Sequence, residues 1–102
     1  MSWRLIMKRA QNIREVRFLV PTGDATTSAG LRSFINHQHK DLKMLNPALN
    51  MPVREGTEDL TPSVIVQYSS GDEKRSDVSG MDERGVQSAV QKLVEAAKFM
   101  KH

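Results

Sequence analysis

Two histidines and an aspartate that lie close together in the sequence are the first residues whose types could do chemistry. His37, His39 and Asp41 all carry side chains that bind divalent metal ions in proteins. On a helix, residues two apart point about 200° away from each other, so the two imidazoles cannot reach one ion. We therefore expect no metal site here, and we expect His37 and Asp41, four residues apart, to form at most a solvated helical pair.

Other chemical signatures are also missing from the sequence. The chain has no cysteine, which excludes thiol nucleophiles, disulfides and metals held by cysteine. The acids Glu55, Glu58 and Asp59 lie in one polar run that could bind a cation, although a hydrated loop is the commoner meaning of such a run. There is no nucleophile elbow, phosphate-binding glycine loop or dinucleotide-binding fingerprint. The sequence therefore predicts a protein with no catalytic, cofactor-binding or metal-binding residues.

Stretches in which apolar and polar residues alternate predict the strands. Two such stretches cover residues 14–20 and 49–53, the β-prone run at 63–68 predicts a third strand, and a short polar stretch at 76–79 is compatible with a fourth. Pro52 confines the second strand to an edge of the sheet, because proline cannot donate a hydrogen bond to a neighbouring strand. The third strand is the most β-prone run in the chain, so we expect it to be central.

Two stretches carry apolar residues at helical spacing. The first follows a turn-forming run in which Thr27 or Ser28 can cap the helix, and it ends before Pro47. The second follows Asp82, whose carboxylate can cap it, and runs to the basic C-terminus. The apolar stripe of the first helix, which should face the sheet, comprises Leu31, Phe34, Ile35, Leu42 and Leu45.

The predicted element order is therefore β-α-β-β-β-α. A helix between the first two strands makes them parallel, and the later hairpin adds antiparallel strands. The sequence predicts an α/β fold in which helices pack on a mixed four-stranded sheet.

The net charge of +3 is unevenly distributed along the chain. Residues 1–20 hold five basic side chains and one acid, whereas residues 21–102 hold ten basic and eleven acidic side chains, so the body is nearly neutral. A nucleic-acid-binding domain usually spreads Lys and Arg over a folded face, so we expect no nucleic acid as a partner. No apolar stretch approaches the roughly 18 residues of a membrane span, and we expect no direct membrane insertion.

Residues 1–12 are interpreted as a basic N-terminal extension. On a helix, Trp3 and Met7 would share one side and Arg4 and Lys8 the other, which is typical of a mitochondrial targeting segment. A docking tail that merely precedes the fold is the alternative, and the two roles are compatible.

Several short motifs resemble one known family. They are similar to those of the thioredoxin-like accessory subunit of mitochondrial complex I, the NADH dehydrogenase 1 alpha subcomplex subunit 2 family, whose domain is shared with two mitochondrial ribosomal proteins. The resemblance spans most of the chain and implies a thioredoxin-like domain over 13–102. The residues that carry it are Ile13-Arg14-Glu15-Val16-Arg17, Leu31-Arg32-Ser33-Phe34-Ile35, Lys40-Asp41-Leu42-Lys43, Asn46-Pro47-Ala48-Leu49, Val53-Arg54-Glu55, Pro62, Tyr68, Gly71 and Glu73.

The resemblance implies a non-catalytic accessory subunit, without a cofactor, in the matrix arm of complex I near the NADH-oxidising module. It places the chain on the matrix side of the mitochondrial inner membrane. The partners that it implies are other complex I subunits, especially the large iron–sulfur subunit of that module, which would carry the electron transfer. The alternative in the same domain family is a mitochondrial ribosomal protein, which the nearly neutral body disfavours.

The sequence departs from the family pattern at two positions. Many members carry a cysteine at the end of the first strand and another after the Arg-Glu pair, and here these positions are Pro21 and Gly56. Without thiols no disulfide can form, so a redox or peroxide-handling enzyme, the third hypothesis, would need a catalytic group other than sulfur. The thioredoxin architecture places a cis-proline beside this site, which makes Pro62 the candidate, although most X-Pro bonds are trans.

Partner contacts are expected where arginine and tryptophan are accessible, because both are favoured at protein interfaces. For Arg54, an ordinary surface position on an edge strand is an equally good interpretation. The candidate partner-binding residues are Trp3, Arg4, Lys8, Arg9 and Arg54.

Overall fold

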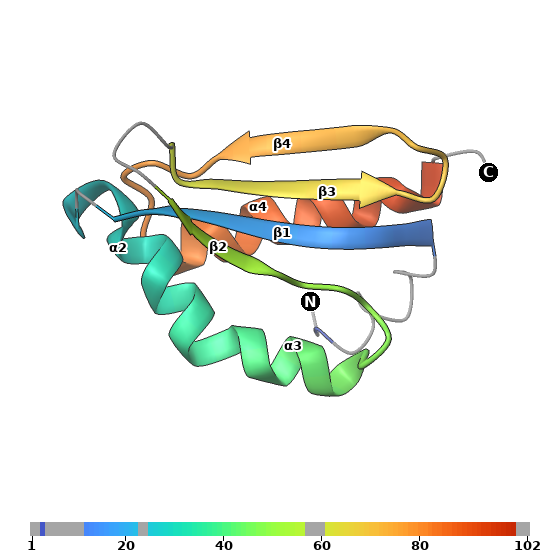
Figure 1. Ribbon diagram of the computed structural model, residues 1–102, viewed down its shortest axis with the longest axis horizontal. Helices are drawn as coiled ribbons and strands as arrows, with labels where there is room; N and C mark the ends of the chain where they lie inside the picture. Colours follow the sequence, from blue (N-terminus) through green and yellow to red (C-terminus); the bar gives the residue numbers. More distant parts are fainter. Residues whose placement is uncertain (1–2, 4–11, 23–24, 57–60, 100–102) are drawn as a thin grey trace.

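The computed structural model describes residues 3, 12–22, 25–56 and 61–99. Helices cover one face of a four-stranded sheet, as Figure 1 shows, and the α/β class predicted from the sequence is confirmed. In chain order the elements are β1 (Ile13–Pro21), α2 (Ala25–Phe34), a π-helical turn (Ile35–His39), α3 (Lys40–Leu45), β2 (Val53–Gly56), β3 (Ser63–Tyr68), β4 (Glu73–Asp77), α4 (Glu83–Glu95) and a 3-10 turn (Ala96–Phe99).

The sheet has the strand order β2-β1-β3-β4. β1 pairs with β2 in parallel, and β3 pairs antiparallel with both β1 and β4. The sheet is therefore mixed, β2 lies at an edge and β3 is central, as the alternation and Pro52 predict.

The short strands begin at other residues than the sequence suggests. β2 starts at Val53, because Leu49 and Met51 are buried ahead of it and Asn50 makes only an isolated bridge to Glu15. β4 starts at Glu73 rather than at residue 76, because the chain reverses tightly after Tyr68. Gly71 has a φ of 97° in this reversal, a conformation that glycine adopts without strain.

The first helix also begins earlier than expected. α2 starts at Ala25, so Thr27 and Ser28 lie inside the helix rather than at its cap. Ser28 is fully buried there, and its hydroxyl accepts a hydrogen bond from Arg32 Nε at 3.3 Å. Leu45, expected on the buried stripe, is 41% exposed at the last residue of α3, whereas Leu42 one turn earlier is fully buried as expected.

The core lies between the sheet and the helices. Side chains from alternate positions of β1 and β3 point toward the helices. The helices α2, α3 and α4 all contribute side chains to the same core cluster. On the opposite face of the sheet, Ile65 lies between its register partners Arg17 and Arg75. Its exposure of 8% is consistent with cover from their aliphatic stems. The core residues include Val16, Phe18, Val20, Leu31, Phe34, Leu42, Val64, Val66, Tyr68, Val86, Val90, Leu93 and Val94.

Polar contacts fix both ends of α4. At its start, the Asp82 carboxylate accepts a hydrogen bond from the Gly85 backbone N–H at 2.8 Å, which confirms the predicted cap. Near its end, the buried Tyr68 hydroxyl donates to the Leu93 carbonyl at 2.6 Å. Burial raises the pKa of Tyr68, so the neutral hydroxyl that makes this bond is favoured.

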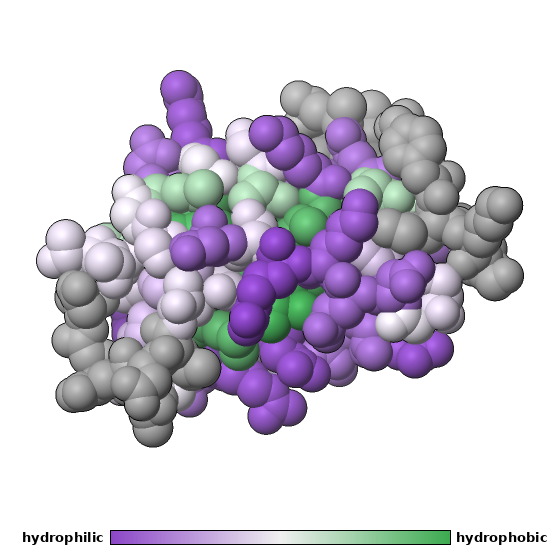
Figure 2. Space-filling view, turned by 90° about the horizontal axis from the view of Figure 1, so that it is seen from above, coloured by the Kyte–Doolittle hydropathy of each residue, from purple (hydrophilic) through white to green (hydrophobic). Residues whose placement is uncertain are grey.

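The surface over β4 is strongly hydrophilic. Figure 2 shows charged and polar side chains over most of this side, with apolar patches between them. The sequence of β4, EKRSD, places charges along the edge of the sheet, which discourages pairing with another strand. No helix in the described part of the chain is both long enough and apolar enough to span a membrane.

Gly30 in α2 lies directly against the turn before α4. A Cβ at this position would lie 1.8 Å from the Met81 carbonyl oxygen, so no side chain fits. The neighbouring Gly80 backbone N–H donates to the Thr27 carbonyl at 2.9 Å and ties the same two segments together. Glycine at position 30 therefore sets how close the turn before α4 lies to α2.

We predict that Gly30→Ala lowers the free energy of unfolding by about 1–3 kcal/mol, as overpacking does elsewhere. Alanine favours a helix over glycine by about 1 kcal/mol, so the clash must outweigh this gain. Urea unfolding followed by circular dichroism measures the difference. The control is Ala29→Gly at the exposed neighbouring position, where only the loss of helix propensity is expected. A Gly30→Ala variant as stable as the unsubstituted protein would contradict the close approach.

Candidate functional site

The two positions interpreted as lost cysteines lie side by side at the ends of β1 and β2. Pro21 and Gly56 are register partners in the parallel pair. The Thr22 backbone N–H and hydroxyl both donate to the Gly56 carbonyl, at 3.2 and 2.8 Å. Neither Pro21 nor Gly56 has a side chain that could act as a nucleophile or a metal ligand.

Arg32 connects α2 to this end of the sheet. Its Nη2 donates to the Pro21 carbonyl at 2.6 Å, and its Nη1 lies 3.7 Å from Glu55 Oε1. The ion pair is largely exposed, so the bond to the carbonyl is the stronger contact. A cavity of about 110 Å³ beside Arg32 is too small for most ligands. Arg32 therefore makes a structural contact at this corner, and Pro21 and Gly56 supply no reactive side chain there.

Pro62 immediately precedes β3 and is buried. None of the peptide bonds in the described residues is cis, so the Thr61–Pro62 bond is trans and the interpretation of Pro62 as a cis-proline is wrong. The trans form is the more stable one for most X-Pro bonds. In this form Pro62 leads directly into β3, and its carbonyl accepts a hydrogen bond from the Val78 N–H at 2.9 Å.

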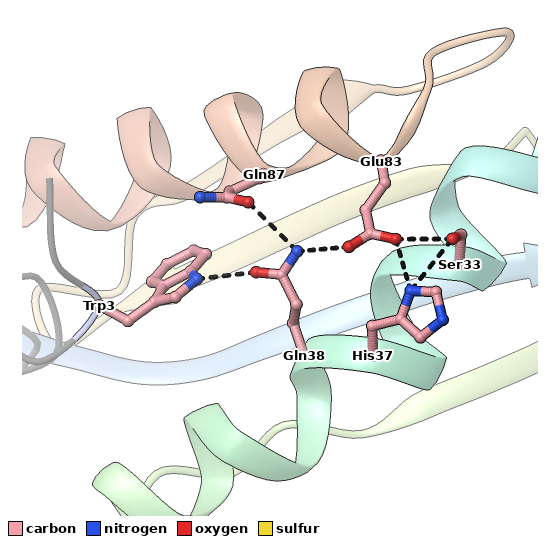
Figure 3. A network of polar contacts seen from close by, with 6 residues as sticks. All are labelled: Trp3, Ser33, His37, Gln38, Glu83 and Gln87. Carbon is pink, nitrogen blue, oxygen red and sulfur yellow. Dashed lines mark hydrogen bonds and ion pairs between the residues drawn. The ribbon is translucent and has the colours of Figure 1, made fainter.

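A second polar cluster joins α2 and the π-helical turn to α4, as Figure 3 shows. Glu83 is its centre: Oε1 accepts from the Ser33 hydroxyl at 2.6 Å and lies 2.7 Å from His37 Nδ1. Its other oxygen accepts from Gln38 Nε2 at 2.8 Å, and the same amide nitrogen donates to Gln87 at 3.2 Å. All of these contacts link residues far apart in the sequence.

Serine, histidine and glutamate are the residue types of a nucleophilic triad, but their geometry does not fit one. In a triad, the serine and the acid contact opposite nitrogens of the imidazole. Here Ser33 and Glu83 both lie beside Nδ1 of His37, at 3.4 and 2.7 Å, and the serine donates its proton directly to the carboxylate. The histidine therefore cannot accept the serine proton on one ring nitrogen while the acid orients the ring through the other.

The cluster stabilises the charged form of Glu83. Hydrogen bonds from Ser33, His37 and Gln38 lower the pKa of Glu83 from its ordinary value of 4.5 to about 2. The side chain is 30% exposed and that of His37 is 67% exposed, so the cluster is open to water. It joins two helices at the surface and encloses no substrate site.

Trp3 docks onto this cluster. Its indole N–H donates to Gln38 Oε1 at 2.8 Å, and its ring meets Phe34 edge-on with the centroids 6.1 Å apart. Trp3 itself is half-buried against the domain. Among the other candidate partner-binding residues, Arg54 is exposed on the edge strand β2, and Arg4, Lys8 and Arg9 lie outside the described residues.

Comparison with known proteins identifies the family. The sequence matches no protein-family model. It is 30% identical to the NADH dehydrogenase (ubiquinone) 1 alpha subcomplex subunit 2 of Arabidopsis thaliana, over 94% of this chain and 95% of that protein. It is 32% identical to the NADH-ubiquinone oxidoreductase 10.5 kDa subunit of Neurospora crassa, over 82% of this chain and 87% of that protein. The chain belongs to the alpha subcomplex subunit 2 family. The predicted family is thus confirmed.

The polar cluster around Glu83 was not predicted from the sequence. His37 and Asp41 were expected to form at most a solvated helical pair, but His37 contacts Glu83. His39 points elsewhere, with Nε2 2.7 Å from the Met51 carbonyl oxygen. Among the described residues, no group of three or more His, Cys, Asp or Glu could hold a metal ion. The π-helical turn that aims His37 and Gln38 toward α4 has no signature in the sequence.

We predict that the stability of this protein falls as the pH drops from about 4.5 to about 2, partly through Glu83. Because the pKa is lower in the folded state, the stabilisation is fully present above 4.5 and is lost as the pH falls through about 2. A Glu83→Gln variant should show a shallower decline in the free energy of unfolding. Hydrogen bonds from Ser79 also lower the pKa of Asp77, so some decline should remain.

Urea unfolding at several pH values between 2 and 6 measures this slope. Glu73→Gln, on the exposed edge strand, is the control and should keep the slope of the unsubstituted protein. If Glu83→Gln also kept that slope, the hydrogen bonds in the cluster would not hold the carboxylate in its charged form.

We also predict that Pro21→Cys combined with Gly56→Cys forms a disulfide under mild oxidation. Paired strands lie about 4.8 Å apart, within the Cα separation that a disulfide needs. Intact mass before and after reduction detects the bond. The control pair is Pro21→Cys with Arg54→Cys, two residues out of register and about 8 Å apart, which should stay reduced. Equal oxidation of both pairs would contradict the register.

Proposed function

We propose that this chain is a non-catalytic accessory subunit of mitochondrial respiratory complex I. The observation that carries the proposal is its likeness, over 94% of its length, to a protein named as an alpha subcomplex subunit of NADH dehydrogenase. A second relative, similar over 82% of the chain, is named as a subunit of NADH-ubiquinone oxidoreductase. The proposed place is the matrix arm, on the matrix side of the inner membrane and near the NADH-oxidising module.

The proposed neighbour is the large iron–sulfur subunit of that module, which would carry the electrons. Two features of this chain support a role without chemistry. Pro21 and Gly56 stand where thiols would be needed, and the contacts of Ser33 with His37 and Glu83 do not form a proton relay. A domain of this kind would contribute surface and stability to its assembly.

The basic segment 1–12 is proposed to act as a targeting or docking segment of the domain at 13–102. Trp3 supports a docking role, because its side chain contacts Gln38 and Phe34 of the domain. The bases Arg4, Lys8 and Arg9 follow Trp3 in the sequence and, with Arg54, remain the proposed partner contacts.

Native gel electrophoresis of a tagged copy in mitochondria tests the proposal. The tag should comigrate with NADH dehydrogenase activity, and mass spectrometry of that band should contain the large iron–sulfur subunit. Comigration with ribosomal RNA, weakened steeply by salt, would instead support a ribosomal protein and overturn the proposal. Turnover of thiol or peroxide substrates by the purified chain would contradict its non-catalytic part.

A further inference from the structure

The outer surface of α3 carries an apolar groove of about 520 Å³. It is lined by His39, Lys40, Lys43, Met44 and Pro47. Met44 is 69% exposed, the highest value among the large apolar side chains described. An apolar hollow with an exposed methionine at its wall is typical of an interaction site, because methionine adapts its shape to a partner.

The charge at the rim of the groove is positive. The Lys43 ammonium donates to the Leu49 carbonyl at 2.5 Å, which fixes it beside the groove. Lys40 is exposed on the same helix. Neither lysine pairs with a carboxylate among the described residues. The groove thus offers an apolar floor between two cations.

We propose that this groove docks an apolar side chain of a neighbouring protein subunit, flanked in its sequence by carboxylates that pair with Lys40 and Lys43. The inference rests on the proposed function, because it assigns a docking surface within that assembly. Complementary charge makes such a segment the best occupant, and burial of the apolar side chain supplies the attraction.

Two other occupants fit the groove less well. In a symmetric dimer the same patch would face itself, which would bring the lysines of one copy close to those of the other. A membrane surface would need a broad apolar face, whereas α3 has only six residues.

The test compares tagged variants in cells that lack their own copy of the chain. Met44→Glu should reduce the recovery of complex I subunits with the tag by about tenfold, because it places a charge in an apolar contact. The double variant Lys40→Glu, Lys43→Glu should have a similar effect through charge reversal. Met81→Glu is the matched control: Met81 is an exposed methionine in the turn before α4, outside the groove, and the variant should behave as the unsubstituted protein.

The outcomes separate the two proposals. If the unsubstituted tagged chain recovers no complex I subunits, the proposed function fails. If it recovers them and both groove variants do so equally well, the function stands and the groove is not the docking surface. Circular dichroism of the purified variants checks folding, and the exposed Lys40 and half-buried Lys43 lie outside the core cluster, so the double variant still decides if Met44→Glu does not fold.

Two further measurements could overturn the inference in favour of another occupant. Sedimentation of the purified chain would reveal a dimer that Met44→Glu dissociates. Flotation with vesicles of phosphatidylcholine and phosphatidylserine would reveal lipid binding that Met44→Glu abolishes. We expect neither, because the proposed occupant is a protein segment.

Discussion

The close approach of α2 to the turn before α4 is the constraint on which much of the architecture depends. Gly30 leaves no space for a side chain beneath the Met81 carbonyl, and the Gly80 N–H bonds to the first turns of α2. The two helices therefore share one face of the sheet and build one core cluster. Glu83 in α4 and Ser33 in α2 are close to this junction in the sequence. Their side chains lie within hydrogen-bond distance of each other.

Directional contacts then determine where α4 lies on the sheet. Apolar burial supplies most of the attraction, but it does not specify how far a helix is shifted along its axis. The Glu83 contacts hold the first turn of α4 against α2. Near the end of α4, the Tyr68 hydroxyl donates a hydrogen bond to the Leu93 carbonyl. This site is buried, so an unpaired polar group there would be costly. Hydrogen bonds to different elements therefore fix the position of α4 at both of its ends.

Sequence reasoning succeeded where the signal is local. The β-branched run of β3 and the Asp82 cap were predicted because each depends on residues within a few positions of one another. It failed where tertiary contacts decide, as with the start of β2 and the partner of His37. The groove around Met44 was missed for the same reason, because the exposure of one residue does not follow from its type. The cis interpretation of Pro62 came instead from the resemblance to the thioredoxin architecture, whereas the general preference of X-Pro bonds for trans predicts the bond that is present.

The π-helical turn between α2 and α3 has an evolutionary consequence. Such a turn contains more residues than an α-helical one, and each residue added to a helix rotates everything after it by about 100°. The turn therefore behaves like a one-residue insertion absorbed within the helix. Loss of one residue among 35–39 would let the turn return to α-helical geometry while α3 keeps the same face toward the sheet. One-residue changes in the length of this segment should consequently be tolerated better than in a regular α-helix.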